Sequence, residues 1–247
     1  MGSTFKEEIM IHTRAERLRA RPLSSIGRAA LHLVPTPERP AAVPASERRP
    51  AIPEAGVGAL DAAAALGRDP FKSPVRLWME KTGRQDLLHP APREDEDIAY
   101  WSRSLEPIVA AHYTVRTGRQ IRRTHTTLQH PKHPWMLATV TREVLASAEV
   151  QLLECLCVGM NAAPLWNQGV PEHIRLRLLH LLAVTGQRAA DVIVLLGGQD
   201  LQIYRIERDE AEIARLIRHE RMFWRGVERD EAPPSQDEAV PLFLPVS

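Results

Sequence analysis

Hydrophobic and polar residues alternate most regularly in the middle of the chain. Three stretches there, QIRRTHTTLQ (120–129), WMLATVTREVLA (135–146) and EVQLLECLCV (149–158), are typical of β-strands. The intervening HPKHP predicts the turn between the first two. Two further runs, ADVIVLL (190–196) and LQIYRIE (201–207), flank the tight-turn sequence GGQD and predict a hairpin. The pattern therefore predicts about five strands.

Helical spacing of apolar residues predicts helices before, between and after these strands. One helix is expected to begin after Ser73, which is a favourable N-cap, and to end at Gly83. A longer helix is expected over 97–117, with Pro107 bending or breaking it. The remaining two are expected over 171–186 and 209–227. This order of elements predicts a mixed α/β (α+β) sandwich, with one mixed sheet flanked by helices.

The two ends of the chain differ in composition from its centre. Residues 1–53 are rich in Pro, Ala and Arg, with one stretch (4–20) able to form a short amphipathic helix. Such a segment buries too little apolar surface to offset its chain entropy, so a flexible arm is expected. The folded domain is expected over 54–231, followed by a disordered tail over 232–247.

Composition narrows the class of protein further. The chain has 247 residues, 44% hydrophobic and 26% charged, with a formal net charge of +1, so any nucleic-acid surface must be local. Its two cysteines, spaced C-x-C, provide no disulfide framework and suit a reducing compartment. No apolar run has the length of a membrane span or the form of a signal peptide, so no membrane partner and a cytoplasmic location are expected.

An acidic residue interrupts the most apolar predicted strand. In LLECLCV, side-chain alternation places Glu154 on one face with Leu152, Leu156 and Val158. An ionised carboxylate on such a face costs roughly several kcal/mol unless it is compensated. Glu154 therefore needs a nearby cation or a special role.

Seven segments, in this order along the chain, resemble the YqaJ-type viral recombinase family. They are DAAAALGRDPFKSPVRLWMEKTGR, SLEPIVAAHYTVRTGRQIRR, LQHPKHPWMLAT, LLEC, HLLAVTG, VLLGGQDLQIYRIERDE and FWRGVE, and they span about Gly56 to Glu231. The family is related to the lambda-type exonuclease within the restriction-endonuclease-like, PD-(D/E)XK fold. The resemblance implies a phage-type or bacterial exonuclease and recombinase of 5′–3′ type that digests duplex DNA from its ends. It also implies Mg²⁺ or Mn²⁺, a single-strand annealing protein as partner, and a homo-oligomer, namely a trimer.

The resemblance assigns site residues position by position. Glu106 in SLEP and Glu154 in LLEC match two acidic metal ligands and catalytic residues of the family. His180 matches a helix histidine, and Asp61 matches the acid of a turn on the DNA side of the site. Mg²⁺ prefers such hard carboxylate oxygens, and in phosphodiester hydrolysis it polarises the phosphate and activates water.

The polar centre of the family's site is nevertheless degenerate in this chain. The strand aspartate is replaced by Thr141, and the lysine two residues after Glu154 is replaced by Leu156. Two glutamines of the family's helix fall at Arg177 and Leu179. Losing one such electrostatic group costs about 10²–10³ in rate, by analogy with oxyanion-hole deletions. We therefore expect a very slow enzyme or none, and expect Glu154 either to have a raised pKa or to pair with Arg177.

Three functions stay open from the sequence. In the first, Glu143 shifts into the site through a β-bulge and joins Glu106 and Glu154 in a working exonuclease. In the second, the chain binds DNA or a recombination partner without catalysis. In the third, it is an inactivated or redesigned scaffold with no DNA role. Arg142 faces away from Thr141 and is a poor water activator, because it is permanently protonated.

Other candidate residues have two interpretations each. The basic segment TGRQIRRT can contact DNA phosphates or form a solvated strand edge, and its arginines are Arg116, Arg119, Arg122 and Arg123. His180 can be a catalyst or a core histidine. His130 and His133 have a metal-ligand spacing, but the neighbouring prolines favour a rigid turn. Cys155 and Cys157 are expected to be small buried hydrophobes rather than thiolate ligands.

Overall fold

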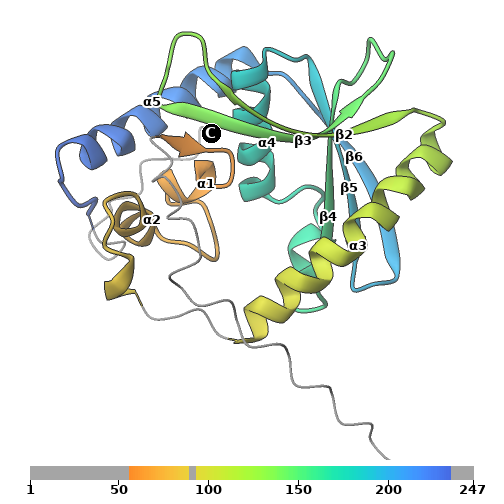
Figure 1. Cartoon of the computed structure of the whole chain (residues 1–247), viewed down its shortest axis with the longest axis horizontal. Helices are drawn as coiled ribbons and strands as arrows, with labels where there is room; N and C mark the ends of the chain where they lie inside the picture. The colour runs from red at the N-terminus through yellow and green to blue at the C-terminus, as the bar shows by residue number, and fades with distance from the viewer. Residues whose placement is uncertain (1–55, 89–92, 235–247) are drawn as a thin grey trace, which may run out of the picture. The chain divides into compact units, whose positions relative to one another are not determined.

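The computed structural model describes residues 56–88 and 93–234. The predicted arm over 1–53, its short helix, and residues 235–247 of the predicted tail lie outside the described residues. Each predicted strand and each predicted helix within the described ranges is present (Figure 1). None of the described helices is long and apolar enough to cross a membrane.

The strands form one six-stranded mixed sheet. They are β1 (Val57–Gly58), β2 (Ile121–Gln129), β3 (Met136–Val144), β4 (Leu152–Val158), β5 (Ala189–Leu196) and β6 (Asp200–Glu207). The sheet has one strand more than the sequence predicts, because the two residues of β1 are too short a stretch to give a pattern. Gly56 lets β1 approach β3 closely, since a Cβ at this position would lie 2.3 Å from the Trp135 carbonyl oxygen.

Strand β3 has three partners and gives the sheet a fork. β2 pairs antiparallel along one edge of β3. β1 (parallel) and β4 (antiparallel) share the opposite edge, at its two ends. The register of β3 with β4 consists of one pair, Glu143 opposite Leu152, beyond which the two strands diverge. β4 then pairs in parallel with β5 along its whole length, and β5 forms an antiparallel hairpin with β6.

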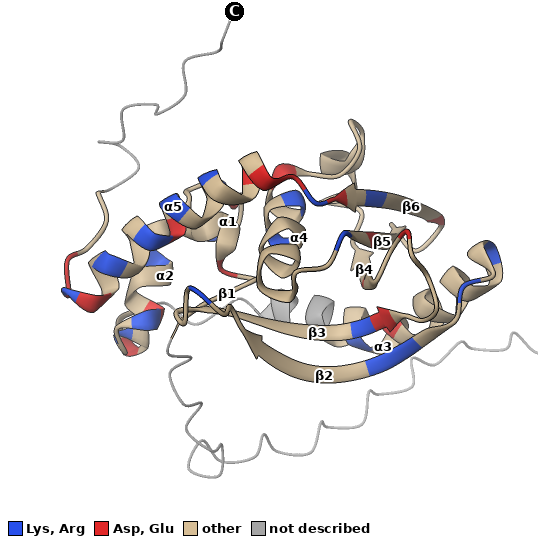
Figure 2. Ribbon diagram, turned by 90° about the horizontal axis from the view of Figure 1, so that it is seen from above, with Lys and Arg blue, Asp and Glu red and all other residues tan. Residues whose placement is uncertain are grey.

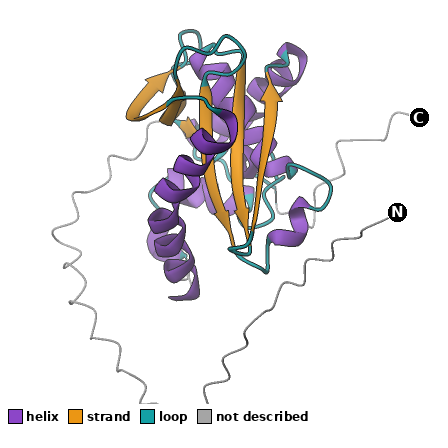
Figure 3. Cartoon of the chain, turned by 90° about the vertical axis from the view of Figure 1, so that its right-hand side faces the viewer, coloured by secondary structure: helices purple, strands orange, loops and turns teal. Residues whose placement is uncertain are grey.

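The helices cover both faces of the β4–β5 part of the sheet. They are α1 (Ala62–Ala65), α2 (Pro74–Lys81), α3 (Arg93–Thr117), α4 (Glu172–Thr185) and α5 (Glu210–Glu228), with short 3₁₀ turns at Gln85–Leu87 and Ala163–Trp166. Among the described elements, α3 crosses one face (Figure 3). α4 packs on the other face, and α1, α2 and α5 lie on the same side as α4 (Figures 1 and 2).

Two apolar clusters follow from this layering. On the α4 side, Leu178 and Leu182 pack with Val192 in a large core. On the α3 side, Val109 and Tyr113 form a smaller core. α3 runs without interruption across Pro107, so of the predicted bend or break the break does not occur. Pro107 lies on the exposed side of the helix, where water can satisfy the carbonyl that loses its N–H partner.

Candidate functional site at the strand fork

The fork between β3 and β4 holds three of the positions that the family resemblance selects, namely Thr141, Glu154 and Leu156. Thr141 and Glu154 both lie two residues from the Glu143–Leu152 pair, so strand alternation puts them on the same face of the sheet. This face packs against α4, as the buried position of Leu152 and the half-buried position of Leu156 in the larger core show. On this face Glu154 thus shares its side of the sheet with the neutral hydroxyl of Thr141 on β3 and the aliphatic side chain of Leu156 on β4.

Glu154 is buried and paired with an arginine. Its side chain is 7% exposed, and its Oε2 accepts a hydrogen bond from Nη2 of Arg177, on α4, at 2.5 Å. Nε of Arg177 is buried without a hydrogen-bond partner among the described residues. The predicted pairing of Glu154 with Arg177 is therefore confirmed. Leu179, at the second substituted glutamine position, is a buried core residue.

Glu106 forms a separate ion pair on the α3 side. Arg142 of β3 donates from Nε to Oε1 at 2.5 Å and from Nη2 to Oε2 at 2.9 Å, which is a bidentate geometry. These hydrogen bonds hold the pKa of Glu106 below its ordinary value, although partial burial acts against them. The neighbouring Cys155 is half-buried, and this burial, followed by the nearby Glu106 carboxylate, raises the pKa of its thiol. Cys155 is thus a protonated core thiol, as expected.

Glu106 and Glu154 lie on opposite faces of the sheet, so the two predicted metal ligands do not converge on one site. α3 packs with Leu153, Cys155 and Cys157, and Ser102 of α3 donates to the Cys157 carbonyl oxygen at 3.2 Å. Glu154 alternates with these residues and faces α4. Within the described part of the chain, no three His, Cys, Asp or Glu side chains form a group that could hold a metal ion.

Glu143 is held away from Glu154 by a cross-strand partner. It lies directly opposite Arg122 of β2, and Arg122 Nη2 donates to Glu143 Oε2 at 2.5 Å. A register shift does occur, but in β2, between Arg123 and Thr126. The proposed bulge that would move Glu143 toward Glu154 is therefore not the one that forms.

His180 is enclosed in the core, where it links three elements. Its side chain is fully buried, with Nδ1 2.8 Å from Oε1 of Glu220 on α5 and Nε2 2.9 Å from the Leu137 carbonyl oxygen of β3. Burial alone would lower the pKa of His180, but the Glu220 carboxylate and this carbonyl outweigh burial and raise it. Both ring nitrogens are occupied, which is the arrangement of a core histidine.

Asp61 is held in place by a hydrogen bond and ion pairs with neighbouring residues. Its Oδ2 accepts from the Gly58 N–H at 3.0 Å and lies 2.6 Å from Nζ of Lys81, while Lys72 lies at 4.0 Å. The side chain therefore ties β1 to α2.

In the HPKHP turn, His130 Nδ1 accepts from the backbone N–H groups of Lys132 and His133, as in a rigid turn.

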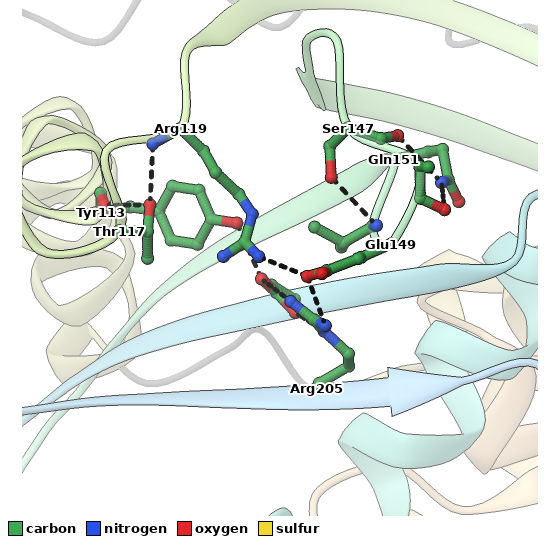
Figure 4. Close-up of polar contacts among 10 residues, drawn as sticks. Tyr113, Thr117, Arg119, Ser147, Glu149, Gln151 and Arg205 are labelled. Atoms are coloured by element: carbon green, nitrogen blue, oxygen red, sulfur yellow. Dashed lines mark hydrogen bonds and ion pairs between the residues drawn. The ribbon is translucent and has the colours of Figure 1, made fainter.

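The four arginines of the predicted basic patch are spread over several partners. Arg116 donates to the Leu201 carbonyl oxygen at 2.6 Å, and Arg123 is exposed. Arg119 donates to Glu149 at 2.7 Å. Figure 4 shows Glu149 between Arg119 and Arg205, which in turn pairs with the buried Asp191. The exposed pairs that Glu149 forms with Arg119 and Arg205 contribute little stability, so DNA phosphates can compete for these arginines.

The structure reveals two important residues that the sequence reasoning missed. Arg142 was set aside because strand alternation directs it away from Thr141, and this direction is correct. Its partner, Glu106, is 36 positions earlier, and no local pattern connects the two. The second is Arg205, which pairs with Asp191 across the β5–β6 hairpin. The two residues are directly opposite in the strand register, so the predicted hairpin could have revealed this pair.

These donors do not fit a magnesium or manganese site. Mg²⁺ requires several hard oxygen ligands in near-octahedral geometry. The two predicted ligands, Glu106 and Glu154, instead each accept from a guanidinium group. The third position is the neutral Thr141, and Glu143 is paired with Arg122.

Comparison with known proteins supports the fold and gives the family. Over 172 residues the chain is 33% identical to a Bacillus subtilis protein described as uncharacterized protein YqaJ, a match that covers 68% of this chain and 52% of that protein. The chain thus spans about half the length of this curated relative. Crystal structures of the alkaline exonuclease LHK-Exo from Laribacter hongkongensis, alone and in complex with dAMP, share the fold with TM-scores of 0.58 and 0.59. Each is 18% identical in sequence to this chain and covers 72% of it, and the matches cover 90% and 91% of those chains.

The chain also matches a known domain family. Residues 51–188, which are more than half of the chain, match the YqaJ-like viral recombinase domain. This region contains the fork, Glu106, Glu154 and both of their arginines. The chain belongs to the YqaJ-like viral recombinase domain family.

Proposed function

We propose that this protein binds duplex DNA ends and does not hydrolyse them. The DNA role follows from the family and from the fold that the chain shares with an alkaline exonuclease. The absence of hydrolysis follows from the residues of this chain. The observation that carries the proposal is that Arg177 and Arg142 neutralise the two glutamates that would be metal ligands.

The charges at the fork explain why a divalent ion would bind poorly. A guanidinium within hydrogen-bond distance already supplies the positive charge that Glu154 or Glu106 would otherwise take from a metal. A metal must displace this group, and the displaced arginine would then repel it. Thr141 adds no charge to compensate. No hydrolytic step is therefore assigned to these residues.

Exposed arginines support the contact with DNA. Arg122 is 65% exposed and Arg123 is also exposed, and both lie at the start of β2, where Figure 2 shows basic residues along the ribbon. Such side chains bind phosphates by releasing counterions from the DNA, and this gives a steep dependence on salt. We propose that these two arginines contribute to the DNA-binding surface.

A binding assay combined with a digestion assay tests the proposal. Fluorescence anisotropy of a labelled blunt-ended duplex is measured over a salt series in EDTA and in Mg²⁺, with closed circular DNA as competitor. We expect salt-dependent binding that EDTA leaves unchanged, weak competition by the circle, and no release of nucleotides. Arg122→Ala with Arg123→Ala should weaken binding and reduce the salt slope.

Two results would contradict the proposal. The first is Mg²⁺-dependent or Mn²⁺-dependent digestion that disappears in the Glu154→Ala variant, which would show a working exonuclease. The second is the absence of binding at low salt, which would indicate a protein without a DNA role.

A further inference from the structure

The outer face of α5 has a line of arginines that lack ion-pair partners. Arg218 and Arg225 are exposed on the helix, and Arg229 is exposed directly after it. Spacings of seven and four residues place the three side chains along one side of the helix, over a length of about 16 Å. None of them forms a side-chain hydrogen bond or ion pair with another residue in the described part of the chain. We call these three residues the α5 arginine line.

The opposite face of α5 already attaches the helix to the fold. Leu216 and Phe223 are buried in the larger core, and Glu220 pairs with His180 of α4. The arginine line is not needed for this attachment, and two of its members lie four residues apart on the helix, where like charges repel each other. A row of like charges that weakens its own helix favours an anionic partner outside the chain.

The acidic residues nearest to the line in the sequence pair with other arginines. Glu228 lies 3.4 Å from Arg221, and Asp230 lies 2.6 Å from Arg84. The line therefore keeps its positive charge, although the formal net charge of the chain is only +1. Figure 2 shows basic residues along the α5 ribbon. A local surface of this kind attracts polyanions.

The residues around the line favour DNA over a protein as the polyanion. Among the exposed residues of α5 from Arg215 onward, all of which the structure describes, Met222 is the only large apolar one. Protein–protein interfaces have an apolar core, which one methionine does not provide. Protein–DNA interfaces are more polar and more positively charged, and arginines that contact phosphates fix the position of the duplex.

We propose that the α5 arginine line binds the backbone phosphates of a DNA duplex at a distance from its end. This inference rests on the proposed function, in which Arg122 and Arg123 contact the same duplex. α5 meets the start of β3, where Cζ of Arg221 lies 5.8 Å from the ring centroid of Trp135. Arg122 instead lies opposite Glu143, near the end of β3. The strand from Trp135 to Glu143 spans about 27 Å, which is the length of about eight base pairs of duplex.

Two hairpin DNAs, each with one blunt end, separate the two contacts. Their stems have about six and about 24 base pairs, so that only the longer stem reaches both surfaces. Fluorescence anisotropy in EDTA over a salt series measures binding. We expect the native protein to bind the longer stem more tightly. Arg218→Ala with Arg225→Ala should remove this preference and lower the salt slope for the longer stem by about 2, with binding of the shorter stem unchanged.

A matched control removes the same charge from other surfaces. Arg103 and Arg188 are exposed, and neither forms an ion pair within the part of the chain that the structure describes. Arg103→Ala with Arg188→Ala should keep the native preference for the longer stem. Circular dichroism should be unchanged in both double variants.

The outcomes distinguish this inference from the proposed function. Equal binding of the two stems by the native protein would overturn the inference alone. The same holds for a preference for the longer stem that survives Arg218→Ala with Arg225→Ala, which would leave the line to an acidic protein surface, or for an equal loss in the control. A native protein that binds neither stem would contradict the proposed function, and the inference with it.

Discussion

Arg177 donates to the buried Glu154 at 2.5 Å, from α4 to β4. The family resemblance places a glutamine at the position of Arg177 and a lysine at that of Leu156. The cation next to Glu154 is therefore supplied by a helix in this chain, not by the strand. We interpret this pair as the reason why an acidic residue can stay in an apolar strand after its original neighbours are gone.

Removing one partner of this pair should cost more than removing both. Arg177→Met leaves Glu154 buried without a cation, and we expect the free energy of unfolding to fall by about 3 kcal/mol. Adding Glu154→Leu should recover most of this loss, because no unpaired charge is then buried. Urea unfolding of the two single variants and the double variant measures the coupling.

Arg175 provides a control on the same helix. It forms an ion pair with Glu212 at the same 2.5 Å, but its side chain is 40% exposed. We expect Arg175→Met to change the free energy of unfolding by at most about 1 kcal/mol. Equal costs for the two methionine variants would refute the special role of the Arg177–Glu154 pair.

The bidentate pair of Arg142 with Glu106 should not tolerate lysine. Arg142→Lys keeps the charge but loses the forked geometry, so we expect a loss of roughly 1.5 kcal/mol or more in unfolding free energy. Arg122→Lys, in the exposed pair with Glu143, should cost less than about 0.5 kcal/mol. Thermal or urea unfolding compares them, and a similar cost for both would argue against a structural role of the Glu106 pair.

The same pair predicts sensitivity to acid. Because Arg142 lowers the pKa of Glu106 in the folded state, the pair contributes its full stability above the ordinary carboxyl pKa. This contribution is lost as the pH falls through the lowered folded-state pKa. The stability difference between the native protein and Glu106→Gln should therefore shrink on acidification. A difference that is constant with pH would contradict this assignment.

The His180–Glu220 pair predicts the opposite pH dependence. The pKa of His180 is raised in the folded state, so its contribution to stability is fully present below the unfolded histidine pKa of about 6.5. It is lost as the pH rises through the folded-state value. The free-energy advantage of the native protein over Glu220→Gln should thus be larger in mild acid than in mild alkali. Urea unfolding across this range measures it, and a larger advantage in alkali would show that His180 is buried in its neutral form.

Much of the fold follows from the sequence because its signals are local. The strand alternation around Glu154 and the start of α2 at Ser73 each depend on a few adjacent residues, and the structure confirms both. The two-residue β1 has no such pattern. It is fixed by a close approach to β3 at Gly56, which only the three-dimensional structure reveals.

The ion pairs at the fork were not predictable from the sequence alone. The resemblance located Glu106, Glu154 and the substituted Thr141, and alternation correctly directed Arg142 to the other face. Which arginine each glutamate meets depends on how α3 and α4 pack on the sheet. Only the choice of Arg177 for Glu154 was open to the sequence, because the family resemblance places both positions in the polar centre of the site.

Restoring the lost polar residues should restore a metal site. Thr141→Asp with Leu156→Lys and Arg177→Gln returns three family residue types to the fork and removes the competing guanidinium. We expect this triple variant to bind Mn²⁺. The single variant Thr141→Asp should bind it weakly, because Arg177 still forms its ion pair with Glu154. Thermal shift on adding Mn²⁺ reports the binding through its linkage to stability. Equal Mn²⁺ shifts in the two variants would show that Arg177 does not compete with the metal.

The most direct measurement is a calorimetric titration of the native protein with Mn²⁺, with Glu154→Ala titrated in parallel. If arginines have taken the place of the metal, the native protein gives no saturable heat and matches the variant. A saturable Mn²⁺ signal in the native protein that is lost in Glu154→Ala would contradict the account.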